Sequence, residues 1–378
     1  MPGLDQTAVR RINTSVVLRV LAGSAQEVTL QWLVGRTGLS RRTIEIILVD
    51  LLADGWVIES PLESDGGAGR PARRFRFAGD RRFVAGVRID THSAHAIVTD
   101  LTGRILGRAE RLLGEDYFTP DRAVGHAIEA ITAAVEAAGV DPDRIVAGGV
   151  AAGGVIDPGP GVVVRLVNAP LWSGFPLADA FTTAFGVPWV ADNDANLAAI
   201  AELRRGAAAG FADVAWIIHG QRTGAGFIVG GQPHRGFRGA AGEIIESRVL
   251  GLARDPDREI GLLTSPDAGG RARAQATVAA ALAGDPEALD AARELAVEIA
   301  DVVDVIAWTI APELVVLGGG LEAGADVIVP LLRERLRELG APDILVVPST
   351  VGEEAPLIGA VLSALDHIDA DLYGPAVS

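Results

Sequence analysis

A change of residue pattern near Arg82 divides the chain into two parts that must fold differently. Before it, apolar residues recur at helical spacing over three short stretches. After it come strand-like apolar runs, glycine-rich loops and alanine-rich helices. Mixed strands and helices are typical of the α/β class, and 378 residues suffice for two or three domains. We therefore expect a small N-terminal head on a larger α/β body.

The amino-acid composition excludes several kinds of functional site. The chain has no cysteine, which excludes disulfides, thiolate zinc sites and iron–sulfur clusters. All 33 basic residues are arginine, so neither a phosphate-loop lysine nor a Schiff-base lysine is present. The first residues lack the layout of an export signal, and no apolar run reaches the length of a membrane span. We expect a cytoplasmic protein with no membrane partner.

Charge is distributed unevenly along the chain. Residues 1–82 hold 12 arginines against 9 acidic residues, whereas the remainder holds 21 against 40, and the net charge is −16. A basic head on an acidic body is typical of nucleic-acid-binding proteins, although so small an excess also fits a merely solvated face. The charge pattern therefore indicates DNA binding only in combination with other features.

Three helices are predicted in the head. Apolar spacing predicts a first helix over 9–21, ended by Gly23, and a second over 30–36. Ser40 is placed to cap a third helix, which Gly55 would end in a left-handed conformation. The inner stripe of this third helix is Ile44, Ile47, Leu48, Leu51 and Leu52. The second and third helices with the turn between them read as a helix-turn-helix.

A hairpin follows the helices and completes the pattern of a winged helix-turn-helix. It consists of a strand at 56–59, a flexible loop at 64–69 and an alternating strand at 72–77. The third helix would read bases, and arginines of the hairpin would contact phosphates and the minor groove. The residues expected to contact DNA are Ser40, Arg41, Arg42, Thr43, Arg70, Arg73 and Arg74. The alternative is a small helical bundle used for protein contacts.

The body carries three features that could support chemistry. Predicted strands occupy 83–87, 94–100, 104–111, 145–151 and 189–191, with a helix over 121–138. The features are Asp192–Asn196 at a strand-to-helix junction and the glycine loops at 223–226 and 317–320. A carboxylate at a helix start can act as a general base, and glycine loops let backbone N–H groups approach phosphate. The structural alternatives are that Asp194 or Asn196 caps a helix and that Gly224 and Gly226 allow a tight hairpin.

The combination of these motifs, in this order, resembles the ROK family, named for repressors, open reading frames and sugar kinases. The matching segments are 10–13, 37–40 and 69–71 in the head, and 149–157, 168–172, 193–194, 224–226, 242–243, 318–320 and 355–360 in the body. The resemblance implies an actin- and hexokinase-like, ribonuclease H-like body of two α/β lobes behind the winged helix-turn-helix. The domains expected from it are 1–82, then 83–192 with 355–378 returning to it, and 193–354.

Two departures from the family pattern bear on activity. The family's kinases have a phosphate loop of the form Gly-x-Asp-x-Gly-Gly-Thr, but here Arg88 replaces the aspartate, and Asp90 and Thr91 replace glycines. These side chains would obstruct and repel phosphate, so neither ATP nor enzymatic activity is expected. The family's zinc-binding segment lacks its cysteines and has Glu246 where its histidine should stand, so zinc is not expected either.

The resemblance, together with these departures, implies a DNA-binding transcriptional regulator, a repressor linked to carbohydrate metabolism. It would bind a double-stranded DNA operator as a homodimer or tetramer and respond to a sugar or sugar-derived effector between the lobes. The effector residues are expected to be Asn193, Asp194, Glu243 and Glu246; alternatively, they only cap helices and hold the lobes together. Two rival functions are a sugar kinase with Asp194 as general base, and a regulator that no longer senses a sugar.

Overall fold

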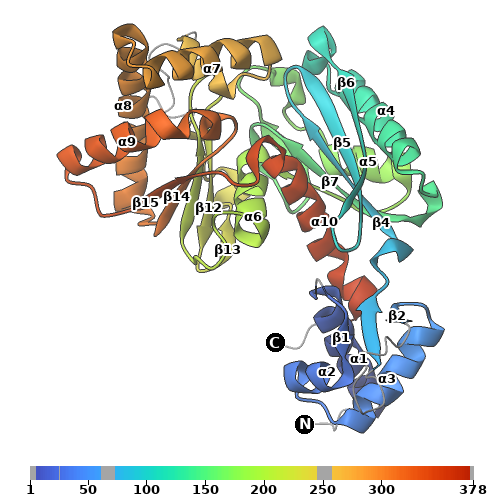
Figure 1. The fold of residues 1–378 in the computed structure, drawn as a ribbon. Helices are drawn as coiled ribbons and strands as arrows, with labels where there is room; N and C mark the ends of the chain where they lie inside the picture. Colours follow the sequence, from blue (N-terminus) through green and yellow to red (C-terminus); the bar gives the residue numbers. More distant parts are fainter. Residues whose placement is uncertain (1–5, 25, 61–72, 245–257, 375–378) are drawn as a thin grey trace.

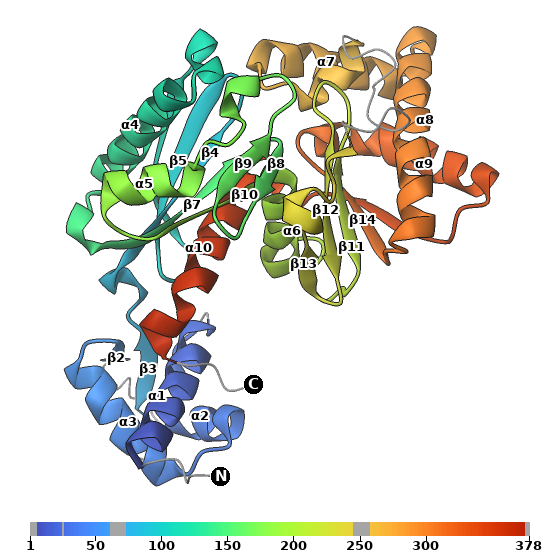
Figure 2. The same cartoon turned by 180° about the vertical axis from the view of Figure 1, so that it is seen from behind.

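The computed structural model describes residues 6–24, 26–60, 73–244 and 258–374, and consists of a head beneath two lobes that lie side by side (Figure 1). Helix α10 (Ala355–Tyr373) runs from the junction of the lobes down to the head, as both views show (Figures 1 and 2). The first and last helices of the chain therefore meet at the head.

Local signals in the sequence set the limits of the head's helices. These helices are α1 (Gln6–Ala22), α2 (Leu30–Thr37) and α3 (Arg41–Ala53). Thr29 caps α2, because its side chain accepts a hydrogen bond from the N–H of Trp32 at 3.2 Å. Gly38 ends α2 at φ 69°, a left-handed conformation that glycine adopts without a Cβ clash. The three predicted helices are confirmed.

Three short antiparallel strands complete the head. They are β1 (Val28–Thr29), β2 (Val57–Ser60) and β3 (Arg74–Phe77), in the order β1-β3-β2. Phe75 and Phe77 are buried, whereas Arg74 and Arg76 between them are exposed, which is the predicted alternation. The predicted loop at 64–69 and Arg70 lie within 61–72, outside the described residues.

The head has a continuous apolar core under α3. Four members of the predicted inner stripe are at most 3% exposed, and the fifth, Leu52, is partly buried. They belong to the same cluster as Val17, Leu18 and Leu21 of α1. Burial of one aliphatic side chain is worth about 1.5–3 kcal/mol, so this packing fixes the inner face of α3 and leaves the opposite face outside.

The first lobe is built on a five-stranded mixed sheet, in the order β10-β7-β4-β5-β6. Its strands are β4 (Phe83–Ile89), β5 (Ser93–Asp100), β6 (Ile105–Leu112), β7 (Ile145–Ala152) and β10 (Trp189–Asn193). Helices α4 (Pro120–Ala138) and α5 (Leu177–Phe185) cover one face, and α10 packs on β4 and β7 from the other (Figures 1 and 2). A separate pair, β8 (Val155–Asp157) and β9 (Val162–Arg165), lies beside β10.

The second lobe repeats this architecture, with the sheet order β13-β12-β11-β14-β15. Its strands are β11 (Val214–Ile218), β12 (Gly224–Val229), β13 (Gln232–His234), β14 (Leu314–Leu317) and β15 (Leu345–Pro348). Its helices are α6 (Asp194–Arg205), α7 (Ala268–Leu282), α8 (Pro286–Thr309) and α9 (Ala325–Leu339). Helix α6 contacts β11, β12 and α10, so it lies between this sheet and α10.

Helix α10 joins the head to the body through a shared core. Val361, Ala364 and Ile368 of α10 belong to the same buried cluster as the apolar residues of α1 and α3. At the end of α10, the ring of Tyr373 meets the ring of Phe77 edge-on, with 6.0 Å between centroids. The head is therefore packed against the body and not merely tethered to it.

The α/β class and the predicted strands of the body are confirmed, with ends shifted by one or two residues. The domain boundaries at 82/83 and 192/193 stay a prediction. Among the helices that the structure describes, none is long and apolar enough to cross a membrane.

Candidate functional site

The first turn of α3 is fixed by its cap. Ser40 has an extended backbone, and its hydroxyl accepts a hydrogen bond from the N–H of Thr43 at 3.1 Å. The same hydroxyl lies 2.8 Å from the Thr43 hydroxyl. The cap predicted at Ser40 is confirmed, and Ser40 and Thr43 serve first to hold this turn.

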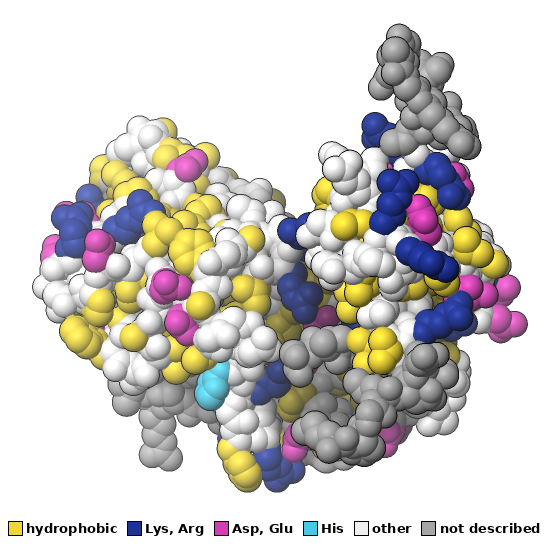
Figure 3. Space-filling model, turned by 90° about the horizontal axis from the view of Figure 1, so that it is seen from below, with side chains coloured by type: hydrophobic (Ala, Val, Ile, Leu, Met, Phe, Trp, Pro, Cys, Tyr) yellow, Lys and Arg dark blue, Asp and Glu magenta, His cyan; other side chains and the backbone are white. Residues whose placement is uncertain are grey.

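Arginines at the start of α3 are exposed. Arg41 forms an exposed ion pair with Glu45, with 3.0 Å between Nε and Oε1, and Arg42 is exposed beside it. Exposed pairs of this kind contribute little to stability, so Arg41 can exchange Glu45 for another anion at small cost. Basic side chains gather on the head in the view from below (Figure 3).

Two of the hairpin arginines, Arg73 and Arg74, were predicted to contact DNA, and they differ in their surroundings. Arg73 donates two hydrogen bonds to Glu59, each 2.5 Å long, and its guanidinium lies over the ring of Phe75. The hydrogen bond from Arg73 lowers the pKa of Glu59. Arg74 points outward from β3. Of these two, Arg74 is therefore the more available for a ligand.

A cavity of about 340 Å³ lies between the two lobes. Both lobes supply polar side chains to its wall, among them Asp90, Tyr117, Asn168, Asp194, Arg222 and Glu243. Three of the four predicted effector residues, Asn193, Asp194 and Glu243, line this cavity together. The fourth, Glu246, lies outside the described residues.

Asn193 organises the wall of the cavity. Its Oδ1 accepts hydrogen bonds from the N–H groups of Ala195 and Asn196 at 2.8 and 3.2 Å, so it caps α6. Its Nδ2 donates to Glu243 Oε1 at 2.7 Å and to the Gly154 carbonyl at 3.0 Å. The alternative that Asp194 or Asn196 provides the cap was wrong, because both lie within α6, whereas Asn193 directly before it has the extended backbone of a cap residue.

Asp194 is the first residue of α6 and lines the cavity. Burial raises the pKa of its carboxyl, and the charges of Arg222 and Arg88 oppose that rise. A carboxylate held this way can accept a hydrogen bond from a hydroxyl group or take up a proton.

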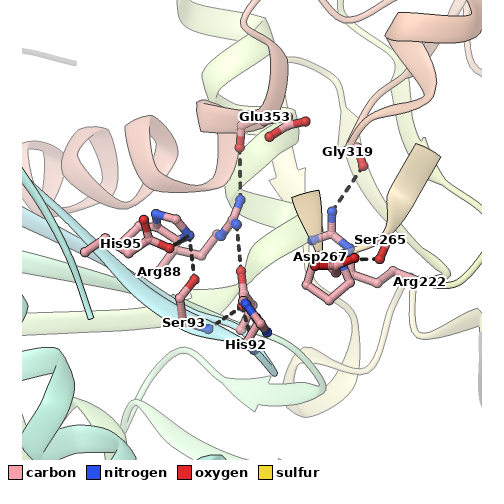
Figure 4. A network of polar contacts seen from close by, with 12 residues as sticks. Arg88, His92, Ser93, His95, Arg222, Ser265, Asp267, Gly319 and Glu353 are labelled. Atoms are coloured by element: carbon pink, nitrogen blue, oxygen red, sulfur yellow. Dashed lines mark hydrogen bonds and ion pairs between the residues drawn. The ribbon is translucent and has the colours of Figure 1, made fainter. Parts of the chain in front are cut away.

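Arg88 ties the first lobe to the start of α10. Its Nη2 donates to Asp90 Oδ2 at 2.6 Å, and its Nη1 donates to the Glu353 carbonyl at 3.1 Å (Figure 4). Its Nε is buried without a hydrogen-bond partner among the described residues. Burial raises the pKa of Asp90, but Arg88 and two backbone N–H groups outweigh it and hold that pKa below its usual range. An ion pair between Arg88 and Asp90 therefore occupies the end of β4 and the turn that follows it.

Arg222 holds the opposite side of the cavity. Its Nε donates to the Thr264 carbonyl at 2.6 Å and its Nη2 to the Gly319 carbonyl at 3.1 Å (Figure 4). Burial lowers its pKa, as does the positive charge of Arg88. Arg222 therefore joins the β11–β12 turn to the glycine loop after β14.

The glycine loops of the second lobe are explained by packing. A Cβ on Gly226 would lie 2.1 Å from the carbonyl oxygen of Ala195, so glycine lets β12 approach α6. A Cβ on Gly320 would lie 1.9 Å from the carbonyl oxygen of Leu263. The tight-hairpin explanation of Gly226 was therefore incomplete, because contact with α6 also requires this glycine.

The comparison with known proteins identifies the family. Residues 84–245 match the ROK family. A glucokinase of Streptomyces coelicolor is 30% identical over 276 residues, which cover 62% of this chain and 84% of that protein. The chain belongs to the ROK family.

Other ROK proteins carry different descriptions. A candidate xylose repressor of Caldicellulosiruptor (strain Rt8B.4) is 23% identical over 245 residues, which cover 64% of this chain and 59% of that protein. The solved structure of a ROK family transcriptional regulator, a homologue of the E. coli MLC protein, has a TM-score of 0.72 at 19% identity and covers 97% of each chain. A likeness at this identity shows a shared fold, which agrees with the predicted ROK body.

Tyr117 is a wall residue of this ROK cavity that was not among the predicted site residues. Tyr117 lies in a 3-10 helix (Gly114–Phe118) between β6 and α4, is nearly fully buried and lines the cavity. Burial and the charges of Asp194 and Asp90 raise its pKa. The Trp172 indole N–H donates to the Tyr117 carbonyl at 2.8 Å and so fixes this turn. No sequence motif marks Tyr117, because its position depends on how this 3-10 helix packs against α4 and Trp172.

Proposed function

We propose that this ROK protein is a sequence-specific DNA-binding transcriptional regulator that acts as a repressor. The observation that carries the proposal is α3, whose inner face is buried in the head while its capped start exposes Arg41 and Arg42. The preceding α2, the turn at Gly38 and the β2–β3 hairpin match a winged helix-turn-helix, in which such a helix enters the major groove.

Contacts with DNA divide into two kinds. Arg42 and Thr43 in the first turn of α3 reach base edges, where arginine pairs with guanine O6 and N7. Arg70, Arg73 and Arg74 contact phosphates or the minor groove, and Arg73 must first release Glu59. Two heads of a homodimer, or of a tetramer, would then read the half-sites of a palindromic operator.

We infer that the body has no kinase activity and takes neither ATP nor zinc. A phosphate loop needs backbone N–H groups that phosphate oxygens can approach closely, with no negative side chain among them. Here the Asp90 carboxylate accepts the N–H groups of His92 and Ser93, each at 2.9 Å, and the Arg88 guanidinium lies against it. An anion would therefore compete with a carboxylate that already holds these donors.

The cavity is the proposed site for a sugar or a sugar-derived effector. Asp194 and Glu243 are suited to accept hydrogen bonds from hydroxyl groups, and Asn193 holds Glu243 in place. A volume of about 340 Å³ lies within the range of small-molecule sites. The net acidity of the body disfavours a phosphorylated effector, although Arg222 on the wall opposes this.

Helix α10 provides a route from the junction of the lobes to the head. Glu353 lies just before α10 and is held by one arginine from each lobe. Its carbonyl accepts a hydrogen bond from Arg88 of the first lobe, and its Oε1 lies 3.3 Å from Nε of Arg271 on α7 in the second lobe. The other end of α10 packs against α1. A ligand that changes the angle between the lobes would move α10 and hence the head, provided that it binds one arrangement more tightly than the other.

An electrophoretic mobility assay with DNA from upstream of the gene tests the proposal. We expect a sequence-selective shift that weakens steeply between about 50 and 200 mM salt. Arg42→Ala should reduce specific affinity about tenfold or more, whereas Arg293→Ala on α8, another exposed helix arginine, should not. Absence of a selective shift at moderate salt would contradict the proposal.

A sugar kinase is the second candidate function, because Asp194 occupies the cavity where a general base would act, and the relatives include glucokinases. Coupled measurement of ADP release over hexoses and N-acetylhexosamines separates the two functions. Turnover that disappears in Asp194→Ala would establish the kinase and overturn the regulator.

A further inference from the structure

The outer face of α3 carries two exposed aliphatic side chains. Ile46 is 48% exposed and Val49 is 62% exposed. Together with Arg42 they follow the spacing i, i+4, i+7, which places the three side chains on one face of the helix. The opposite stripe fills the core of the head, so Ile46 and Val49 are not needed to hold α3 in place.

These two side chains are well suited to make contacts outside the head. Isoleucine and valine are branched at Cβ and have few rotamers in a helix, so little side-chain entropy is lost when they are covered. Burial of their exposed methyl groups would be favourable by the hydrophobic effect. If this face of α3 contacted only water, the Ile46 and Val49 side chains would contribute no burial of apolar surface.

Arginines are in excess around this pair, because the two acidic neighbours of Ile46 and Val49 are both ion-paired, Glu45 with Arg41 and Asp50 with Arg10. Arg41 and Arg42 lie at the start of the same helix, and Arg36 is exposed on α2, with its guanidinium over the ring of Trp32. A surface with basic groups around an aliphatic centre complements a polyanion that presents methyl groups. The major groove of DNA has this chemistry, since thymine exposes its C5 methyl there between two phosphate backbones.

The length of this face of α3 fits the part of a helix that lies in one major groove. From Arg42 to Val49 the helix rises about 10 Å, at about 1.5 Å per residue. Base pairs are stacked about 3.4 Å apart, so this face spans about three of them. Arg42 and the aliphatic pair can therefore contact neighbouring base pairs in one half-site.

We propose that Ile46 and Val49 read thymine methyl groups in the major groove, so that each half-site carries thymine within about three base pairs of the base that Arg42 contacts. The proposal rests on the proposed function and adds the residues and the chemical group that set part of the specificity. Arginine anchors the helix, and the aliphatic pair distinguishes thymine from the other bases by apolar contact.

The test uses the full-length protein and works without a known operator. Binding sites are first selected from a randomised duplex pool, and each thymine of the selected site is then replaced by uracil, which removes only the methyl group. We expect a loss of about fourfold in affinity at one or two positions, the value of one buried methyl group. The remaining positions should be unaffected.

Alanine variants assign the effect to residues. Ile46→Ala and Val49→Ala should weaken binding to the thymine site and abolish the uracil penalty at one position each, because the methyl group then has no partner. Val305→Ala, an exposed β-branched residue of α8, should change neither affinity nor penalty. Since both head residues are exposed, an unchanged Tm will show that the variants remain folded.

The outcomes separate the inference from the function on which it rests. Failure to select any sequence overturns the regulator itself. A selected site with no uracil penalty, or a penalty that survives in both alanine variants, overturns methyl reading and leaves the regulator intact. A change of oligomeric state in Ile46→Ala without any change in DNA affinity would show that the pair contacts protein, which also overturns the inference.

Discussion

Arg19 of the first helix and Asp369 of the last helix form a two-point ion pair, in which Nε and Nη2 donate to Oδ2 at 3.0 and 2.5 Å. Arg19 also donates to the carbonyl of Gly374 at the end of α10. These contacts lie at the end of α10 that reaches the head, whereas Glu353, which accepts a hydrogen bond from Arg88, precedes its other end. The pair therefore stands on the route that would carry a signal from ligand to DNA.

Breaking this pair should loosen the head without unfolding the body. Asp369→Asn removes a partly exposed charge that binds Arg19 at two points, so we expect amide hydrogen exchange in α1 to speed up by a factor that corresponds to about 1 kcal/mol. Asp366→Asn, which breaks the exposed pair with Arg204 on α6, is the matched control. Equal exchange in α1 of both variants would show that the pair does not hold the head.

Loss of Arg88 should cost stability because it leaves a buried carboxylate unpaired. The Arg88 and Asp90 side chains are 13% and 9% exposed, so Arg88→Ala should lower the free energy of unfolding by about 3 kcal/mol. The nearby Arg108→Ala breaks an exposed pair with Glu354 and should cost less than about 1 kcal/mol. Denaturant titration of both variants measures the difference, and equal losses would refute the role given to Arg88.

The pH dependence of Asp90 follows from the sign of its shift. Its pKa is lower in the folded state than in the unfolded chain, so its contribution is fully present above the unfolded value and is lost as pH falls through the folded value. Arg88→Ala removes the cation that lowers this pKa. The stability difference between wild type and Arg88→Ala should therefore shrink below about pH 4 in thermal unfolding.

The contribution of Asp194 to stability should depend on pH in the opposite direction to that of Asp90. Burial raises its pKa, so the charged form costs stability above the folded value, and this cost disappears as pH falls towards the ordinary aspartate range. Asp194→Asn should therefore raise the Tm at neutral pH, with a gain that decreases on acidification. A Tm that falls at neutral pH would mean that the carboxylate is stabilised by its neighbours.

Effector binding can be tested by thermal shift. We expect a neutral sugar, and not every sugar, to raise the Tm of the wild type, and Glu243→Gln to reduce the shift because a charge-assisted hydrogen bond is lost. Glu110→Gln, outside this cavity, is the control. If neither sugars nor sugar phosphates raise the Tm, the proposed sugar effector is contradicted, and the alternative of a regulator that no longer senses a sugar is favoured.

The parts predicted from sequence were those set by neighbouring residues. Ser40, Gly38 and the apolar stripe of α3 act within a few positions, so the helices of the head could be predicted. The cap of α6 was predicted wrongly at Asp194 or Asn196, because several polar residues stand at this junction and the extended backbone of Asn193 makes it the cap. The contact between Arg19 and Asp369 joins residues 350 positions apart, which no local pattern reveals.

The packing of α10 on α1 also bears on biosynthesis. Phe77 and Arg19 are translated before the two lobes, but Tyr373 and Asp369, which cover and bind them, are translated after both lobes. The head thus acquires these contacts only after both lobes have been translated. A fragment ending at residue 82 would lack them, so the head should reach its final packing only after both lobes have emerged.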